Sequence, residues 1–350
     1  MKYGVIPTNL FERLALWSGK VPVPVIDAVL SITKARTIMA GVRLGIFEAL
    51  RNEPLGSAEI AERCGLDAEC TELLLRTLVF AGYLKQNGGG YALSRLSKKS
   101  LVSGAETELV GYLQWNYTQW EMLENLEDLI RTGRGIDFHE TMTDRAAWAD
   151  YQRAMLELAR LGAPVVASRV PVRRGAKRLL DLAGSHGLIG AAICRRHPPM
   201  KSEVLELPVA IEHARRLARD EKIDDIVSHR AGDIRVDDLG NQNDVVLLSN
   251  ILHHFNPETI LDILDRAYRS LNPDGTVAIW EIEASDKNRK PDEADGGALL
   301  FRLTSNAGCY SGSEYARGLK QIGFKRVRTS RPALSPGNVL VTGRVDGREE

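Results

Sequence analysis

The sequence predicts a mainly parallel α/β sheet domain preceded by a smaller, mainly helical domain. Two observations lead to this fold class. After Arg178, short apolar segments alternate with amphipathic helical segments, which is typical of a parallel sheet covered by helices on both faces. Before Ser103, helical periodicity dominates and one strand pair is indicated. With 350 residues, 44% of them hydrophobic, the chain has room for about two domains of ~100–200 residues.

The N-terminal part, from about residue 28 to 103, has the pattern of a winged helix. Ser57 is placed to cap a helix over residues 58–64, and Asp67 is placed to cap the next helix. Residues 83–94 then read as two strands joined by the Asn-Gly-Gly-Gly turn at 87–90. The order of helix, turn, helix and hairpin predicts a winged-helix domain over residues 1–105.

The charges on this domain argue against DNA binding. The helix that would enter a DNA groove carries Asp67, Glu69 and Glu72 against the single basic residue Arg76, so phosphates would repel it. The chain as a whole carries 46 basic and 46 acidic residues, and thus no net charge to attract nucleic acid or an anionic membrane. We expect a structural or dimerising role, with a ligand-sensing regulator as the alternative.

Residues 106–175 are predicted to form a helical linker that contributes to a substrate pocket. Aromatic residues are frequent there: Trp115, Tyr117, Trp120, Trp148 and Tyr151. They suit either packing between helices or the wall of a pocket for a flat, apolar substrate. Tyr151 and Met155 lie one helical turn apart, so they are candidate substrate contacts.

Residues 176–350 are predicted to form the sheet domain. Parallel strands are expected near 178–183, 202–206, 226–230, 244–249 and 277–281, followed by an antiparallel pair at 325–331 and 338–344. Ligands of such sheets bind at the carboxyl ends of the strands, where the topology switches. Asp181, Glu206, Asp233 and His253 all fall at that edge.

The turn after the first strand has the composition of a nucleoside site. Asp181 ends the strand, Gly184 and Gly187 permit a tight turn, and a helix over residues 188–196 follows. The glycine spacing differs from the dinucleotide pattern G-x-G-x-x-G, so a nucleoside without phosphates fits better than NAD. Glu206, about twenty residues further on, suits the two hydroxyls of a ribose.

Several segments together carry a resemblance to a known family. They are DLAGSHG from Asp181, ELP from Glu206, AGDI from Ala231, ILHHF from Ile251 and LNPDGTVAIWE ending at Glu281. From about residue 28 to 344 the chain resembles the S-adenosylmethionine-dependent O-methyltransferases of the plant caffeate and bacterial antibiotic type. The resemblance implies a Rossmann-like class I methyltransferase domain, a homodimer formed through the winged-helix domain, and methyl transfer to a hydroxyl of a small aromatic or polyketide-like metabolite.

The resemblance also implies which residues hold the cofactor. Asp181, Gly184 and Gly187 would bracket the methionine part, Glu206 would bind the ribose, and Asp233 with Ile234 would bind the adenine. The remaining candidates are Leu207, Gly232, Ser249 and Asn250.

His253 is the candidate general base. A phenol with a pKa near ~10 needs a base at neutral pH, and a histidine with a pKa near ~6.5 can serve. A helix capped by Asn256 should begin just after it, and its positive end would keep the imidazole neutral. By the resemblance, His253 is the base and Glu281 holds its other ring nitrogen; His254 is the alternative base.

The sequence also departs from the plant members of the family. They carry Asp and Trp where His254 and Phe255 stand, and a second Glu near Tyr310. The loss of that carboxylate leaves one acid for the base. Residues that shape the pocket are also expected over 301–310, and Tyr310 is a candidate substrate contact. Acceptor nitrogen or carbon atoms, and a non-methylating reaction with the same cofactor, are compatible with these patterns.

Cysteine spacing and hydropathy bear on metals and location. The four cysteines lack C-x-x-C spacing, so neither a zinc site nor a disulfide framework is expected. No apolar run reaches the ~18 residues of a membrane span, and no signal peptide is apparent. We expect a cytoplasmic protein that binds no membrane and no nucleic acid.

Overall fold

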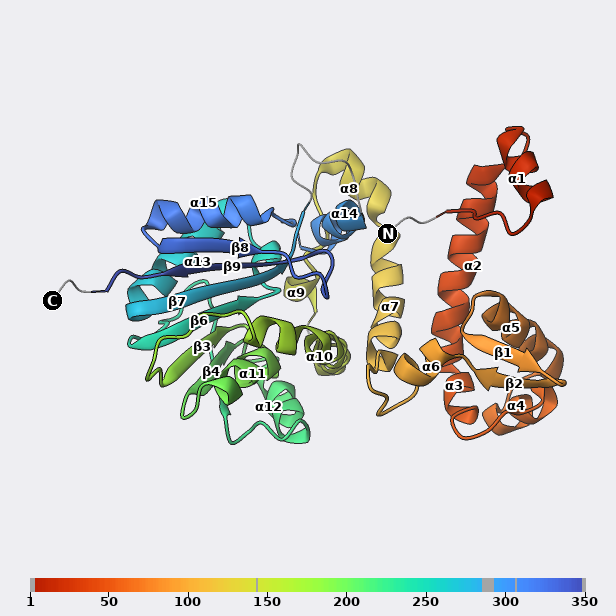
Figure 1. Cartoon of the computed structure of the whole chain (residues 1–350), viewed down its shortest axis with the longest axis horizontal. Coiled ribbons are helices and arrows are strands. Elements are labelled where there is room, and N and C mark those ends of the chain that lie inside the picture. The colour runs from red at the N-terminus through yellow and green to blue at the C-terminus, as the bar shows by residue number, and fades with distance from the viewer. Residues whose placement is uncertain (1–3, 143, 285–292, 306, 348–350) are drawn as a thin grey trace. The chain divides into compact units, whose positions relative to one another are not determined.

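The computed structural model describes residues 4–142, 144–284, 293–305 and 307–347. The chain divides into two compact units, Met1–Tyr117 and Thr118–Glu350, and it passes from one to the other within α7 (Val110–Leu123) (Figure 1). In the described part of the chain, no helix is long and apolar enough to cross a membrane.

The first unit contains the predicted order of helix, turn, helix and hairpin, which is confirmed. Its elements are α1 (Leu10–Trp17), α2 (Val23–Arg43), α3 (Ile46–Ala49), α4 (Ser57–Cys64), α5 (Ala68–Phe80), β1 (Leu84–Asn87), β2 (Gly90–Leu93) and α6 (Arg95–Ser100). Strands β1 and β2 pair antiparallel, and their turn contains Gly88 and Gly89 with positive φ. One apolar core joins α2 to α5 with the hairpin, and Phe47, Leu75 and Tyr91 are fully buried in it.

The two predicted caps of this unit have different outcomes. The Asp67 side chain accepts a hydrogen bond from the Cys70 amide at 2.8 Å, so this prediction is confirmed. The prediction for Ser57 is wrong, because α4 begins at Ser57 itself and the extended Gly56 is the N-cap. Since Ser57 is already helical, its hydroxyl contacts Glu72 of α5 instead.

The second unit contains a seven-stranded sheet in the order β5-β4-β3-β6-β7-β9-β8. Its strands are β3 (Arg178–Leu182), β4 (Lys201–Glu206), β5 (Val227–Ala231), β6 (Asn243–Ser249), β7 (Leu271–Ile282), β8 (Lys325–Ser330) and β9 (Asn338–Arg344). The first five pair in parallel, and β9 pairs antiparallel with both β7 and β8. The predicted strands and the terminal antiparallel pair are confirmed, except that β7 begins earlier, where Leu271 pairs with Asn243.

Helices cover both faces of this sheet (Figure 1). The helices of this unit are α8 (Leu126–Thr132), α9 (Phe138–Thr141), α10 (Arg145–Ala167), α11 (Leu188–Arg196), α12 (Ile211–Asp220), the 3-10 turn η1 (Leu252–His254), α13 (Pro257–Ser270), α14 (Glu293–Ser305) and α15 (Gly312–Ile322). Among them α11, α12, α13 and α15 pack directly against the strands. Successive strand residues point to opposite faces. Leu179 therefore joins the core beneath α10 and α11, while Leu180 joins the core beneath α13 and α15.

The topology switches direction at β3. The chain adds β4 and then β5 on one side of β3, and returns with β6 on the other side. The loops that follow β3 and β6 therefore diverge, which leaves a crevice at the carboxyl ends of these strands. The predicted site residues lie on the segments around this crevice.

Candidate active site

A cavity of about 210 Å³ lies at this edge of the sheet. One buried water molecule needs only about 10–15 Å³, so the cavity can hold a ligand of many atoms. It is lined by most of the predicted site residues, namely Tyr151, Met155, Asp181, Gly184, Glu206, Leu207, Gly232, Asp233, Ile234, Ser249 and Asn250. Four others, Gly187, His253, Glu281 and Tyr310, lie outside the lining and are described below.

The glycines of the first turn occupy positions where a side chain has no room. A Cβ on Gly184 would come within 2.2 Å of the Asp181 carboxyl carbon. Gly187 has a φ of +74°, and a Cβ there would come within 2.6 Å of Val227 Cγ1. Gly187 also precedes α11, which starts at Leu188 as predicted. The sequence thus folds into a turn that presents Asp181 to the cavity.

Two buried carboxyl groups form the floor of the cavity. Glu206 accepts hydrogen bonds from the Ser185 amide at 2.9 Å and from the Leu207 amide at 2.8 Å. Burial raises the pKa of Glu206 to about 7, although these two bonds act in the opposite direction. Burial also raises the pKa of Asp181 to about 7, and the nearby Glu206 charge adds to the shift. Both groups would be more fully ionised next to a cation.

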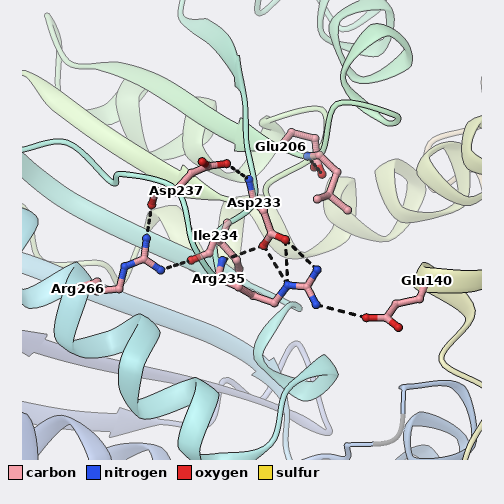
Figure 2. A network of polar contacts seen from close by, with 8 residues as sticks. Glu140, Glu206, Asp233, Ile234, Arg235, Asp237 and Arg266 are labelled. Atoms are coloured by element: carbon pink, nitrogen blue, oxygen red, sulfur yellow. Dashed lines mark hydrogen bonds and ion pairs between the residues drawn. The ribbon is translucent and has the colours of Figure 1, made fainter.

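Asp233 takes part in a network of charges on one side of the cavity (Figure 2). Arg235 donates to both of its carboxylate oxygens, with the shortest contact at 2.8 Å, and reaches Glu140 of α9 at 3.4 Å. Burial alone would raise the pKa of Asp233, but the Arg235 bonds hold it below its usual value. Arg266 of α13 fixes the same loop by donating to the Ile234 carbonyl at 2.7 Å. Asp233 is therefore an ionised, rigidly held acceptor.

Sequence reasoning did not identify Arg235 as part of the site. It lines the cavity together with Glu140. Its guanidinium already donates to the carboxylate of Asp233, which is predicted to bind adenine. Its position directly after the AGDI segment is a signal that could have found it. Nothing in the local sequence marks Glu140, because α9 is a single short turn.

His253 and Glu281 form the predicted pair. His253 Nδ1 lies 2.6 Å from Glu281 Oε2, and the other carboxylate oxygen accepts from the Ile251 and Leu252 amides at 2.8 and 2.7 Å. Glu281 is fully buried and His253 is 3% exposed. The His253 ring packs against Phe301 and the His254 ring, with centroids 4.0 and 4.2 Å apart. The pair thus stands directly behind the wall that His254 contributes.

The remaining wall is aromatic. His139, Trp148, Tyr151 and His254 line it, and His254 Nδ1 lies 2.6 Å from the Ser305 hydroxyl. Sequence reasoning missed His139, because the short segment around it carries no motif. The Tyr310 hydroxyl donates to the Phe255 carbonyl at 2.8 Å, so Tyr310 supports Phe255, which lines the cavity, from behind.

The fold and the cavity define a nucleoside-cofactor enzyme of the class I methyltransferase type, and comparison with known proteins gives its family. The sequence model of the O-methyltransferase domain matches residues 115–325, and that of the O-methyltransferase dimerisation domain matches residues 26–103. The chain belongs to the O-methyltransferase family, and it is an S-adenosylmethionine-dependent O-methyltransferase.

Relatives align over almost the whole chain. The 3-hydroxy-5-methyl-1-naphthoate 3-O-methyltransferase of Streptomyces sahachiroi is 27% identical over 92% of this chain and 95% of its own. Acetylserotonin O-methyltransferase of Bos taurus is 26% identical over 85% of this chain and 90% of its own. Among solved structures, human N-acetylserotonin methyltransferase in complex with S-adenosylmethionine superimposes with a TM-score of 0.84 at 19% identity, covering 97% of this chain and 100% of that chain.

The cavity fits this cofactor chemically. Several buried polar atoms of the cavity lining, among them Asp181 Oδ1 and Asn250 Oδ1, have no hydrogen-bond partner among the residues that the structure describes. Such atoms are costly to bury unless a ligand satisfies them. Glu206 uses two of its roughly four acceptor positions for backbone amides, which leaves others for ribose hydroxyls. Asp181, Glu206 and Asn250 are therefore the residues that would hold the amino acid and ribose parts.

Proposed function

We propose that this enzyme methylates a phenolic or enolic hydroxyl of a small, flat aromatic metabolite, with His253 as general base and Glu281 as its positioning residue. Bound S-adenosylmethionine supplies the electrophilic methyl group. The observation that carries the proposal is the 2.6 Å contact between His253 Nδ1 and the buried Glu281 carboxylate, next to a cavity that fits the cofactor.

The pair has the arrangement of an oriented base. A neutral imidazole carries one N–H and one acceptor nitrogen. Because a carboxylate only accepts, Nδ1 must carry the proton, and Nε2 is left to accept one from the acceptor hydroxyl. Glu281 is itself held by two backbone amides, so the ring orientation is fixed before any substrate binds.

The aromatic wall of the cavity and the reactions named for the relatives support a flat aromatic acceptor. Trp148 and Tyr151 lie edge to face with ring centroids 5.9 Å apart, a shape that suits a flat ring system. Relatives include the tetracenomycin 8-O-methyltransferase of Streptomyces glaucescens, and also an L-tyrosine C(3)-methyltransferase and an N,N-dimethyltransferase. The atom that receives the methyl group is therefore part of the test.

We further propose that the enzyme works as a homodimer in the cytoplasm. The family's dimerisation domain supports this, as do large apolar side chains exposed on α1 and α2, among them Phe11 (82% exposed) and Trp17 (87% exposed). Exposed apolar groups at this density are typical of a surface that a partner covers.

The test is methyl transfer from labelled S-adenosylmethionine to a panel of hydroxylated, aminated and unsubstituted naphthalenes, with product analysis by mass spectrometry. Label should appear on oxygen, and His253→Ala should lower kcat/KM by about 10²-fold or more. Glu281→Gln should also lower it, because an amide NH₂ directed at Nδ1 would force the proton onto Nε2.

The matched control is Glu283→Gln. This carboxyl follows the same strand but binds Arg331 and the Gly312 amide at 2.8 Å, outside the cavity. It should keep its activity when its folding is verified by thermal melting. A wild-type rate in folded His253→Ala enzyme would reject the base assignment, and label on carbon or nitrogen alone would reject the acceptor class.

A further inference from the structure

A second pair of histidines faces the cavity beside the base. His139 comes from α9 and His254 from η1, segments far apart in the sequence. Their ring centroids lie 4.2 Å apart at an interplanar angle of 82°, and both rings line the cavity. The His253 ring is also 4.2 Å from that of His254, so the base and this histidine pair are immediate neighbours.

The ring nitrogens of this pair are left for a ligand. His254 Nδ1 is bound to the Ser305 hydroxyl, which fixes the ring. Its Nε2, and both nitrogens of His139, make no hydrogen bond to any residue that the structure describes. A buried polar atom without a hydrogen-bond partner destabilises the folded protein. At this aromatic wall, a bound molecule would supply the missing partner.

The pair is also uncharged. Burial lowers the pKa of His139 to about 3, and the neighbouring His253 adds to the shift. Burial lowers the pKa of His254 well below its ordinary value, with His253 and then His139 adding to it. A neutral imidazole offers one donor and one acceptor, so the pair suits a hydroxyl or carbonyl oxygen better than a carboxylate.

We propose that His139 and His254 bind a second, uncharged oxygen of the acceptor, on the ring carbon next to the hydroxyl that is methylated. Adjacency follows from the contact between the two rings: His253 stands directly behind His254, so an acceptor whose hydroxyl reaches His253 brings its neighbouring ring substituent against His254. The preferred substrates are thus vicinally oxygenated aromatics, such as ortho-dihydroxy or ortho-hydroxycarbonyl compounds. This inference rests on the proposed function and adds the substrate pattern to it.

The experiment compares two acceptors that differ by one hydroxyl, 2,3-dihydroxynaphthalene and 2-naphthol. We expect wild-type enzyme to prefer the diol in kcat/KM by about tenfold, as one or two added hydrogen bonds would give. His254→Phe, which keeps a flat ring, should reduce this preference to within about twofold, because kcat/KM should fall more for the diol than for 2-naphthol. His139→Phe should act in the same direction, and His213→Phe on α12, outside the cavity, should change nothing.

Binding provides the second readout. With S-adenosylhomocysteine present, calorimetry should show the same loss of preference for the diol in the dissociation constants of the His254→Phe enzyme. Equal turnover of both acceptors by wild-type enzyme would overturn this inference and leave the proposed function standing. An equal fall in kcat/KM for both acceptors in His254→Phe, with the preference for the diol retained, would make His254 a base and overturn the positioning role.

Two further outcomes distinguish failure of the histidine subsite from failure of the proposed function. Preference for 3-hydroxy-2-naphthoate over the diol would overturn the uncharged character of the subsite. Failure of wild-type enzyme to bind or methylate any of the three naphthalenes would overturn the proposed acceptor class, and the inference with it.

Discussion

Burial shifts the pKa values at the two ends of the cavity in opposite directions; we call Asp181 and Glu206 the cofactor end, and His139 and His254 the acceptor end. At the cofactor end, burial raises the pKa of Asp181 and Glu206 to about 7. At the acceptor end, burial lowers the pKa of His139 to about 3 and that of His254 far below its usual value. Acids move up and bases move down because burial penalises whichever form is charged.

The difference shows where charge can enter the site. The carboxyl groups are half ionised near neutral pH, so a cationic ligand can draw them into the charged form. Neutral pH lies far above the lowered pKa values of His139 and His254. Both imidazoles therefore stay neutral and add no positive charge beside a sulfonium. We therefore expect the cofactor end to respond to its ligand electrostatically, and the acceptor end to recognise its ligand by hydrogen bonds and shape.

The largest expected effect comes from removing one of the two acids. Glu206→Gln should weaken binding of S-adenosylhomocysteine about ten- to hundredfold, because hydrogen bonds to a charged group contribute about 1.5–3 kcal/mol. Calorimetry measures the dissociation constant. Glu203→Gln is the matched control, since Glu203 lies on the same strand but pairs with Arg230 at 2.8 Å and lies outside the cavity lining. Unchanged affinity in Glu206→Gln would remove the ribose role from this carboxylate.

A smaller effect should appear in the pH dependence of cofactor binding. Because the pKa of Asp181 and of Glu206 is raised to about 7 without ligand, a cation binds the deprotonated form more tightly and releases protons. Affinity for S-adenosylmethionine should therefore increase as pH rises from about 6 to about 8, by up to about tenfold in total for each carboxyl group, and should level off above the pKa. His139 and His254, whose pKa values are lowered by burial, add nothing in this window.

The control for the pH experiment is the ligand. Uncharged 5′-methylthioadenosine lacks the sulfonium and the amino acid, so its affinity should depend on pH much less. Asp181→Asn should flatten the profile for S-adenosylmethionine as well. An affinity for S-adenosylmethionine that falls as pH rises would contradict the raised pKa values of Asp181 and Glu206.

The meeting of the residues at the proposed cofactor end was predictable from the sequence, because their placement follows directly from local pattern. The glycine turn, Asp181 and Glu206 each end a strand, and parallel strands bring their ends to one edge. The contact between His253 and Glu281 follows in the same way, since Ser249 of β6 pairs with Trp280 of β7 and the two residues come next to these strand ends.

The acceptor end was predicted only in part, because its wall is assembled by tertiary packing. Tyr151 and Met155 line the cavity, as their helical spacing indicated. His139 reaches His254 only because the short α9 begins after Asp137, whose φ is +51°. No pattern of neighbouring residues encodes such a contact. The direction of the Tyr310 side chain, toward the Phe255 carbonyl, was equally absent from the sequence.

The smallest expected effect tests whether the Ser185 backbone, without its side chain, is enough to shape the turn after β3. Ser185 has a φ of +51°, and its buried hydroxyl has no partner among the residues that the structure describes. Ser185→Gly should raise the free energy of unfolding by about 1 kcal/mol, because glycine adopts this conformation without strain. Ser168→Gly, at a φ of −76°, should instead lower it by about 0.5–1 kcal/mol. Denaturant titration measures both. Since the Ser185 amide still donates to Glu206, affinity for S-adenosylhomocysteine should not change; a loss of affinity would mean that the hydroxyl itself contacts the ligand.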